Sequence, residues 1–228
     1  GVRLAPFHPG EAARRFETLA ASDSQNVEAH WRAAISRADE AELLVAKAER
    51  PRRDSLLALA LAHGRRGVRL DSTSVWPSFA LGLVLGNLAL TKGVRDRVRL
   101  AVEIRRLALR ALAADSMHDG AHHLLGRWHA EARRLSGFER LLARTLLGGG
   151  VLGEASREEA RRHLARAAAI DSMRILHRLE LAKVCLDQKD EACAGAELRA
   201  ALSQPERFAA DAGYKRRAEE LLARLERR

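Results

Sequence analysis

The chain has 228 residues, of which 47% are hydrophobic and 31% are charged, a composition typical of a soluble globular protein with a well-buried core. No stretch reaches the roughly 18 consecutive apolar residues that a membrane-spanning helix needs, so we expect no transmembrane segment. The net charge is +10, and 35 of the 40 basic residues are arginine, an arginine-rich composition typical of a bacterial protein. Because the chain starts at Gly1, as a chain does after removal of a signal peptide, the sequence leaves open whether it is cytoplasmic or exported.

Strong helix formers, namely Ala, Leu, Arg and Glu, dominate the sequence, and β-branched residues form no alternating runs. The sequence therefore predicts an all-α protein. In chain order, we expect helices over residues 10–21, 26–46, 53–69, 74–90, 94–113, 118–134, 156–169, 173–187, 190–203 and 207–226.

A repeat is marked by four aspartates that each precede a serine and follow a helical stretch, namely Asp23, Asp71, Asp115 and Asp171. Eleven residues after each aspartate comes a small residue, which lets two helices approach closely: Ala34, Gly82, Gly126 and Ala182. This pattern predicts a tetratricopeptide-like solenoid of helix hairpins, wound as a right-handed superhelix. We expect one domain over 1–228, with units over about 26–71, 74–115, 118–171 and 173–203, and terminal capping helices over about 10–21 and 207–226.

The third unit contains the stretch GGGVLG at residues 148–153, which formally fits the dinucleotide-binding pattern G-x-G-x-x-G. That pattern requires a preceding β-strand, whereas FERLLARTLL at 138–147 has helical periodicity. We therefore expect no nucleotide. Instead, the glycines are predicted to end a short extra helix and to form a flexible link to the next one. That next helix is expected to begin with a capping box made by Ser156 and Glu159.

The same region resembles the regulator of microtubule dynamics family, whose members have a tetratricopeptide-like domain. The matching features are the L-G-x-W run at Leu125, Gly126 and Trp128, the basic insertion at 136–147, and the E-E-A-x-x-x-x-x-R-A pattern at 158–167. The resemblance is most specific over 120–172 and is strongest to bacterial tetratricopeptide proteins of this kind. It implies a binding scaffold, with microtubule association and membrane-contact or lipid-binding roles among eukaryotic members.

A partner is expected on the concave surface, which the first helix of each unit lines in such solenoids. Residues 8, 12 and 16 places after the aspartates share one helix face. This face is apolar at one end and mixed in charge at the other, which suits a peptide or an amphipathic acid. The predicted partner-binding residues are Trp31, Ile35, Phe79, Leu83, Asn87, His123, Arg127, Glu131 and Lys183. Two alternatives stay open: the aromatic residues pack between repeats, or Arg127 and Glu131 pair within their helix.

A second candidate surface is basic and lies between residues 92 and 110. Its predicted members are Arg95, Arg97, Arg99, Arg105 and Arg106. Such a run suits an anionic membrane surface or, less favoured here, a nucleic acid. The alternative is that these arginines are only the solvated face of a helix.

No motif for catalysis or metal binding is present: the sequence has neither H-E-x-x-H nor G-x-S-x-G, and its nine histidines lack a clear third ligand. We therefore expect no enzyme, no metal and no cofactor. Cys185 and Cys193 are predicted to be two small buried thiols, although a disulfide is geometrically plausible in a helix hairpin. The leading hypothesis is a non-catalytic scaffold that captures a protein or peptide. The alternatives are a carrier of a lipid or amphipathic small molecule, and binding through the basic surface.

Overall fold

The computed structural model describes residues 8–135 and 149–227, which form helices and no strand. The all-α prediction is therefore confirmed over the described residues. The first five α-helices are α1 (Pro9–Ser22), α2 (Val27–Glu42), α3 (Arg50–Leu70), α4 (Val75–Ala89) and α5 (Val94–Ala114). The others are α6 (Asp119–Arg134), α8 (Arg157–Ile170), α9 (Ile175–Asp187), α10 (Glu191–Ser203) and α11 (Asp211–Leu225). Two short 3₁₀ helices are η1 (Lys47–Glu49) and η2 (Gly149–Glu154).

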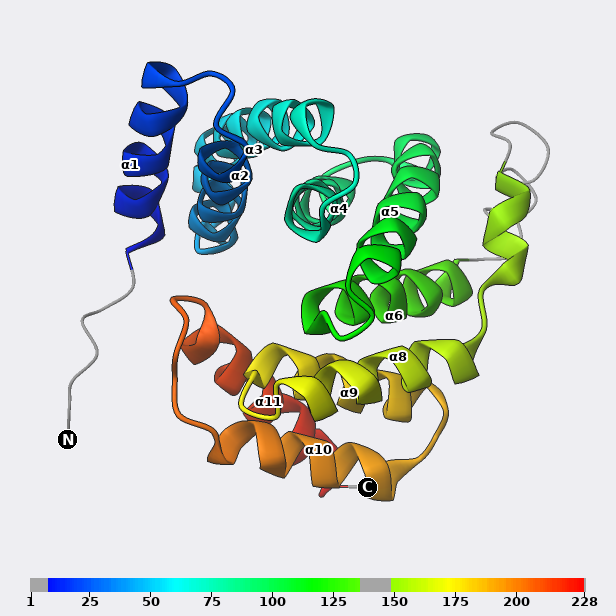
Figure 1. Ribbon diagram of the computed structural model, residues 1–228. Helices are drawn as coiled ribbons and strands as arrows, with labels where there is room; N and C mark the ends of the chain where they lie inside the picture. The colour runs from blue at the N-terminus through cyan, green and yellow to red at the C-terminus, as the bar shows by residue number, and fades with distance from the viewer. Residues whose placement is uncertain (1–7, 136–148, 228) are drawn as a thin grey trace.

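The helices pack as successive antiparallel hairpins: α2 with α3, α4 with α5, α6 with α8, and α9 with α10 (Figure 1). Each second helix also packs against the first helix of the next hairpin. At the two ends of the array, α1 packs on α2, and α11 packs on α9 and α10. This arrangement is a tetratricopeptide-like helical solenoid.

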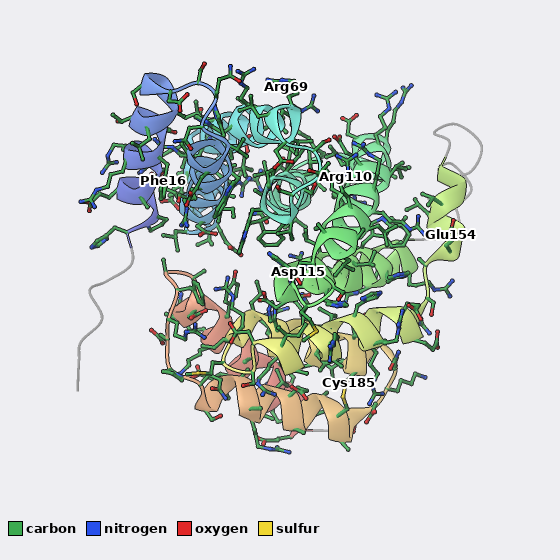
Figure 2. The ribbon with its side chains drawn as sticks, in the orientation of Figure 1. Phe16, Arg69, Arg110, Asp115, Glu154 and Cys185 are labelled. Carbon is green, nitrogen blue, oxygen red and sulfur yellow. A yellow bond between two sulfur atoms is a disulfide. The ribbon has the colours of Figure 1, made fainter. Side chains whose placement is uncertain are left out.

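The four repeat aspartates all end a helix and make the same side-chain hydrogen bond. Each ends a helix (α1, α3, α5 or α8), and its Oδ1 accepts a hydrogen bond from the backbone N–H two residues later, over 2.8–3.1 Å. Asp115 illustrates this at the turn that follows α5 (Figure 2). The aspartate carboxylate therefore gives a backbone N–H of the turn its acceptor and sets the turn into the next helix.

Small residues are required where the helices of a hairpin cross. A Cβ added to Gly126 would lie 2.7 Å from Leu164 Cγ and 3.1 Å from the Ala160 carbonyl oxygen, both on α8. A Cβ on Gly82 would lie 2.9 Å from Leu124 Cδ1 of α6, in the next hairpin, and 3.7 Å from Leu107 Cβ of α5, its own hairpin partner. At the equivalent places in the other two hairpins, Ala34 and Ala182 are fully buried. The small residues predicted to be at helix crossings do lie there.

Three local predictions fail or lie outside the described residues. The predicted flexible link is instead partly helical, since Gly149–Glu154 forms η2, and Leu152 is buried with residues of α5 and α6. The capping box is incomplete: Ser156 Oγ accepts from the Glu159 N–H, but the Glu159 carboxylate faces Arg162 and His163 instead of returning to Ser156. The predicted extra helix lies among residues that the structure does not describe.

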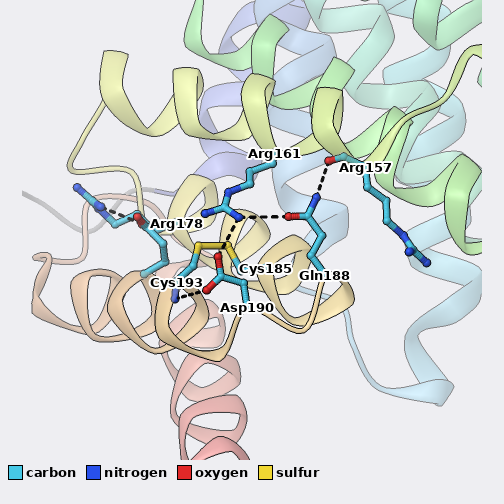
Figure 3. The surroundings of a disulfide bond; sticks show 8 residues. Arg157, Arg161, Arg178, Cys185, Gln188, Asp190 and Cys193 are labelled. Atoms are coloured by element: carbon cyan, nitrogen blue, oxygen red, sulfur yellow. Dashed lines mark hydrogen bonds and ion pairs between the residues drawn. A yellow bond between two sulfur atoms is a disulfide. The ribbon is translucent and has the colours of Figure 1, made fainter.

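The prediction of two free thiols is wrong, because Cys185 and Cys193 form a disulfide (Figure 3). The cause is the tight reversal between α9 and α10, where Lys189 adopts a positive φ of 60°. This reversal brings the two Cα atoms to 5.9 Å, within the range that a disulfide spans. Asp190 caps α10 through the Cys193 N–H and binds Arg161 of α8. The reversal is thereby tied to the preceding hairpin as well.

The first and last parts of the solenoid touch through α2 and α11. The Tyr214 hydroxyl donates a hydrogen bond to Glu42, and Asp39 faces the same small cavity, which Arg174 and Phe208 also line. Burial, reinforced by the nearby Glu42 charge, raises the pKa of Asp39 to about 7. A carboxyl group whose pKa is raised to about 7 therefore lies at the contact between the two ends.

Gly126→Ala should destabilise the protein by about 1–3 kcal/mol, because the new methyl group meets the α8 backbone and the cost of overpacking exceeds the helix-propensity gain of about 1 kcal/mol. The matched control is Gly86→Ala, whose added Cβ meets its nearest neighbour, Leu124 Cδ2, at 4.0 Å. This control should be stabilised by about 0.5–1 kcal/mol. Urea unfolding of both variants measures the difference. Equal effects would contradict the close crossing at Gly126.

Asp39→Asn should alter how stability depends on pH. In the wild type, the folded state keeps the Asp39 proton between pH 4 and about 7 while the unfolded state loses it, so the free energy of unfolding falls as pH rises through that window. Because asparagine has no carboxyl group to ionise, the variant does not lose this stability as pH rises. It should be more stable than the wild type at pH 8 by on the order of 2–4 kcal/mol, but not at pH 4.

Thermal unfolding at both pH values checks this difference. Asp54→Asn is the control, since Asp54 is exposed, and it should follow the wild type at both pH values. A constant difference between Asp39→Asn and the wild type would contradict the raised pKa.

Candidate functional site

The inner surface of the solenoid is made by the first helices of the hairpins, since α2 packs against α4, α4 against α6, and α6 against α9. The predicted partner-binding residues all belong to these four helices. The structure brings Trp31 and Phe79 into an aromatic group and Arg127 and Lys183 into a charged group. The other five lie outside both groups, namely Ile35, Leu83, Asn87, His123 and Glu131.

The aromatic group joins α2, α4 and the start of α6. Trp31 stacks on Trp76 with ring centroids 4.8 Å apart, and Trp76 meets Phe79 edge-on at 6.1 Å. His118 contacts both Trp76 and Phe79 at 4.7 and 4.6 Å. Although large and apolar, Trp76 keeps 43% of its surface exposed. The group therefore offers an open aromatic face.

His118 leaves one buried donor beneath this face. Its Nδ1 accepts a hydrogen bond from the Ala121 backbone N–H and caps the start of α6. Burial lowers the pKa of His118, so the ring is neutral at neutral pH and carries its proton on Nε2. That buried Nε2–H finds no hydrogen-bond partner among the described residues. An orphan donor of this kind is costly unless a bound group supplies an acceptor.

His123 leaves a buried acceptor on the same helix. His177 Nε2 lies 2.8 Å from the Asp119 carboxylate, and His177 Nδ1 lies 2.9 Å from His123 Nδ1. Because a carboxylate only accepts, His177 carries its proton on Nε2, and His123 must donate from Nδ1. His123 Nε2 is then an unprotonated nitrogen, and it has no partner within the described part of the chain. Complete burial lowers the pKa of His123 well below its ordinary value and keeps the ring neutral.

The charged group lies farther along the same helices. Glu180 of α9 is buried between Lys183, whose Nζ is 2.7 Å away, and Arg127 of α6, whose Nε is 3.8 Å away. Burial alone would raise the pKa of Glu180, but the charges of Arg127 and Lys183 outweigh it and lower that pKa. The expected pairing of Arg127 with Glu131 is not found, because Glu131 pairs with Arg134, which also binds Asp187.

The remaining predicted residues contribute differently. Ile35 packs against the core between α2, α3 and α4, as does Trp31, one of the aromatic residues for which packing between repeats was the alternative interpretation. Leu83 and Asn87 are half-buried on α4. They belong to neither the aromatic nor the charged group.

The predicted basic residues of α5 do not form one surface. Arg105 turns toward η2, where it binds Glu154 at 2.5 Å and covers the Trp128 ring. Arg97 lines a cavity beside Val98 and Trp128. Arg95, Arg99 and Arg106 are exposed, and the latter two lie near acids of their own helix, namely Asp96 and Glu103. Only part of the predicted patch is therefore free to meet an anionic partner.

A cavity of about 130 Å³ opens between α4, α5, α6 and η2. Apolar side chains from these elements line most of it, and Arg97, Arg127 and Glu131 supply its polar edge. The sequence placed the apolar end of the binding groove at Trp31, Phe79 and Leu83 instead. Arg127 is thus shared between this cavity and the charged group.

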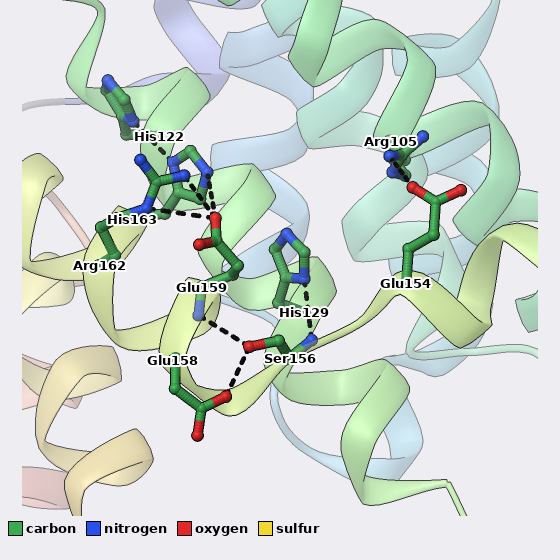
Figure 4. A network of polar contacts seen from close by, with 9 residues as sticks. All are labelled: Arg105, His122, His129, Glu154, Ser156, Glu158, Glu159, Arg162 and His163. Atoms are coloured by element: carbon green, nitrogen blue, oxygen red, sulfur yellow. Dashed lines mark hydrogen bonds and ion pairs between the residues drawn. The ribbon is translucent and has the colours of Figure 1, made fainter.

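A separate polar cluster joins α6 to α8 and includes the residues best placed to hold a metal ion (Figure 4). His129 of α6 and Glu159 and His163 of α8 have ligand atoms within 4.8 Å of one another. His163 Nδ1 also lies 2.8 Å from His122 Nδ1. None of these residues was identified as a ligand from the sequence.

None of the helices that the structure describes has both the length and the apolar character that a bilayer crossing requires. Comparison with curated protein sequences finds no match. Among solved structures, the chain is similar to TTC0263, a thermophilic tetratricopeptide protein of Thermus thermophilus. The two share 18% identity and a TM-score of 0.65, covering 94% of this chain and 91% of that one. This likeness shows the tetratricopeptide fold.

Weaker similarity is found to IFIT1 bound to m7Gppp-AAAA, with 16% identity, a TM-score of 0.50, and coverage of 87% of this chain and 47% of IFIT1. Human IFIT1 with PPP-AAAA gives 18% identity, a TM-score of 0.47, and coverage of 86% and 46%. The family model for regulator of microtubule dynamics protein 1-3 matches residues 8–226, nearly the whole chain. The protein therefore belongs to the regulator of microtubule dynamics family.

Proposed function

We propose that the protein is a non-catalytic scaffold that binds an extended peptide segment of a partner protein across the start of α6. The tetratricopeptide-like fold supports a helical-repeat binding scaffold in general terms. The observation that carries the narrower proposal is the pair of buried orphan groups on α6, the His118 Nε2 donor and the His123 Nε2 acceptor.

A peptide backbone suits this pair because each of its units offers one acceptor and one donor. Because both nitrogens are buried, the side chains around them must move aside on binding. A partner carbonyl oxygen would then accept from His118, and a partner N–H would donate to His123. Both groups are neutral, so the backbone is bound without charge. This argues for an extended segment, whose backbone groups are free, over a helix, whose groups are already paired.

The surroundings define which side chains such a segment would carry. Exposed Trp76, stacked on Trp31, offers a face for an aromatic or apolar side chain. Arg127 and Lys183 are both partly exposed, whereas the carboxylate that they share, Glu180, is buried, so the accessible charges at this contact are positive. We expect a ligand with an apolar side chain near Trp76 and an acidic residue toward α9.

The cavity between α4, α5 and α6 favours this proposal over the lipid-carrier alternative. Its volume of about 130 Å³ is close to the roughly 150 Å³ that accommodates a molecule of benzene. It is below the roughly 300 Å³ at which pockets for drug-sized ligands begin. The cavity therefore suits one apolar side chain of a partner better than the acyl chains of a lipid.

Trp76→Ala should weaken binding of a selected peptide at least tenfold without unfolding the protein, since Trp76 lies in the first turn of α4 and is exposed. Peptides are selected from a random display library on the wild type, and dissociation constants are measured by fluorescence anisotropy. Circular dichroism verifies the fold.

Leu109→Ala is the control, because Leu109 is similarly exposed (41%) but lies on α5, a second helix of its hairpin. Peptides that bind both variants as tightly as the wild type would contradict the proposed site. The Phe79→Ala/Arg127→Ala double variant, which removes one member of each group, should abolish binding.

A further inference from the structure

Two histidine pairs occupy equivalent places in the first and third hairpins. His122 Nε2 lies 3.1 Å from the Ser116 carbonyl oxygen, and His122 Nδ1 lies 2.8 Å from His163 Nδ1. Because a carbonyl oxygen only accepts, His122 carries its proton on Nε2 and accepts at Nδ1. His163 must then donate from Nδ1, which leaves an unprotonated nitrogen at its Nε2.

This unprotonated nitrogen faces a carboxylate. His163 Nε2 lies 3.7 Å from Glu159 Oε2, one turn earlier on α8. Neither atom has a proton to give, so the two lone pairs repel each other unless a cation or a proton donor such as water lies between them. The Arg162 guanidinium binds the same carboxylate, but its side chain is 68% exposed and such pairs are weak. The buried side of the pair has no comparable cation among the described residues.

His129 completes the group from α6. It is buried, as is His163, and its Nδ1 accepts one long hydrogen bond of 3.3 Å from the Ser156 N–H. Two imidazole nitrogens and one carboxylate oxygen thus converge within 4.8 Å, from two helices that a long connection separates in sequence. Figure 4 shows His129, Glu159 and His163 around the start of α8.

The first hairpin provides an internal comparison. His30 Nε2 lies 3.3 Å from the Ser24 carbonyl oxygen, and its Nδ1 lies 3.0 Å from His63 Nδ1. The ring protons of this pair are therefore arranged as in the pair of His122 and His163. At the places equivalent to His129 and Glu159, however, this hairpin has Arg37 and Leu59. The first hairpin therefore has the permanently charged Arg37 at the place of the His129 imidazole. It has the apolar Leu59 at the place of the Glu159 carboxylate.

We propose that His129, Glu159 and His163 bind a divalent transition metal ion of the zinc class, which joins α6 to α8. Two imidazoles and a carboxylate form a known zinc donor set, with a fourth position left for water on the exposed side. In a tetrahedral site, ligands at 2.0–2.1 Å from zinc lie about 3.3–3.4 Å from one another. Ligand atoms that are up to 4.8 Å apart must therefore draw inward when the ion binds. The half-exposed Glu159 side chain can supply this movement by leaving Arg162, and His129 exchanges its long bond from Ser156 for the metal.

The test uses zinc ion alone, added to tag-free protein that has been stripped with a chelator, with binding followed by calorimetry at pH 7.5. We expect one ion per chain and a raised melting temperature. Glu159→Gln should weaken binding at least tenfold, and it leaves the Ser156 cap of α8 intact because that cap uses the Glu159 backbone N–H. Cobalt substitution should give visible absorption bands of a four-coordinate ion in the wild type and not in Glu159→Gln.

His63→Gln is the matched control, because it removes one member of the equivalent pair in the first hairpin, where Leu59 stands at the place of Glu159. This variant should bind zinc as the wild type does. Zinc binding that is equally weak in the wild type and Glu159→Gln would show an adventitious ion only and would overturn the proposal. Binding that survives in Glu159→Gln but disappears in His63→Gln would also overturn it.

Discussion

The close crossing of α6 and α8 at Gly126 is the constraint on which both proposed sites depend. With no side chain at this position, Leu164 and the Ala160 carbonyl of α8 come against the α6 backbone. Trp128, two residues later, is buried and donates its indole N–H to the Ala101 carbonyl of α5 over 2.8 Å. These contacts fix the position and rotation of α6. With α6 held in this orientation, His123 and Arg127 face α9, and His122 and His129 face α8.

The solenoid was predictable from sequence because its determinants are local. An aspartate that ends a helix acts on its own backbone neighbours, so Asp23, Asp71, Asp115 and Asp171 are visible without knowledge of the fold. The small residues eleven places later are equally visible. The predicted ends of the helices were less accurate. For example, α3 begins at Arg50, three residues before the predicted start, because Pro51 is well suited to a first helical turn.

The sites were less predictable because their contacts join different helices that are far apart in the sequence. Arg127 and Glu131 have the spacing of a pair within one helix, yet Arg127 faces Glu180 on α9. Burial of the Glu180 carboxylate favours that partner, which helix spacing cannot reveal. The histidine pairs did leave a signal: His30 and His122 both follow a repeat aspartate by seven residues, and His63 and His163 both precede one by eight. Alignment of the repeats would therefore have found the pairs, but not their approach to His129 and Glu159.

The central claim is that His118 presents a buried N–H and His123 a buried lone pair, because those two groups define what the inner surface can bind. Nitrogen-15 NMR of the histidine rings measures this directly, since protonated and unprotonated ring nitrogens have very different chemical shifts. We predict a proton on His118 Nε2 and none on His123 Nε2 at neutral pH, with both resonances moving when a selected peptide is added. A proton on His123 Nε2, or resonances that do not respond to a bound peptide, would contradict this claim.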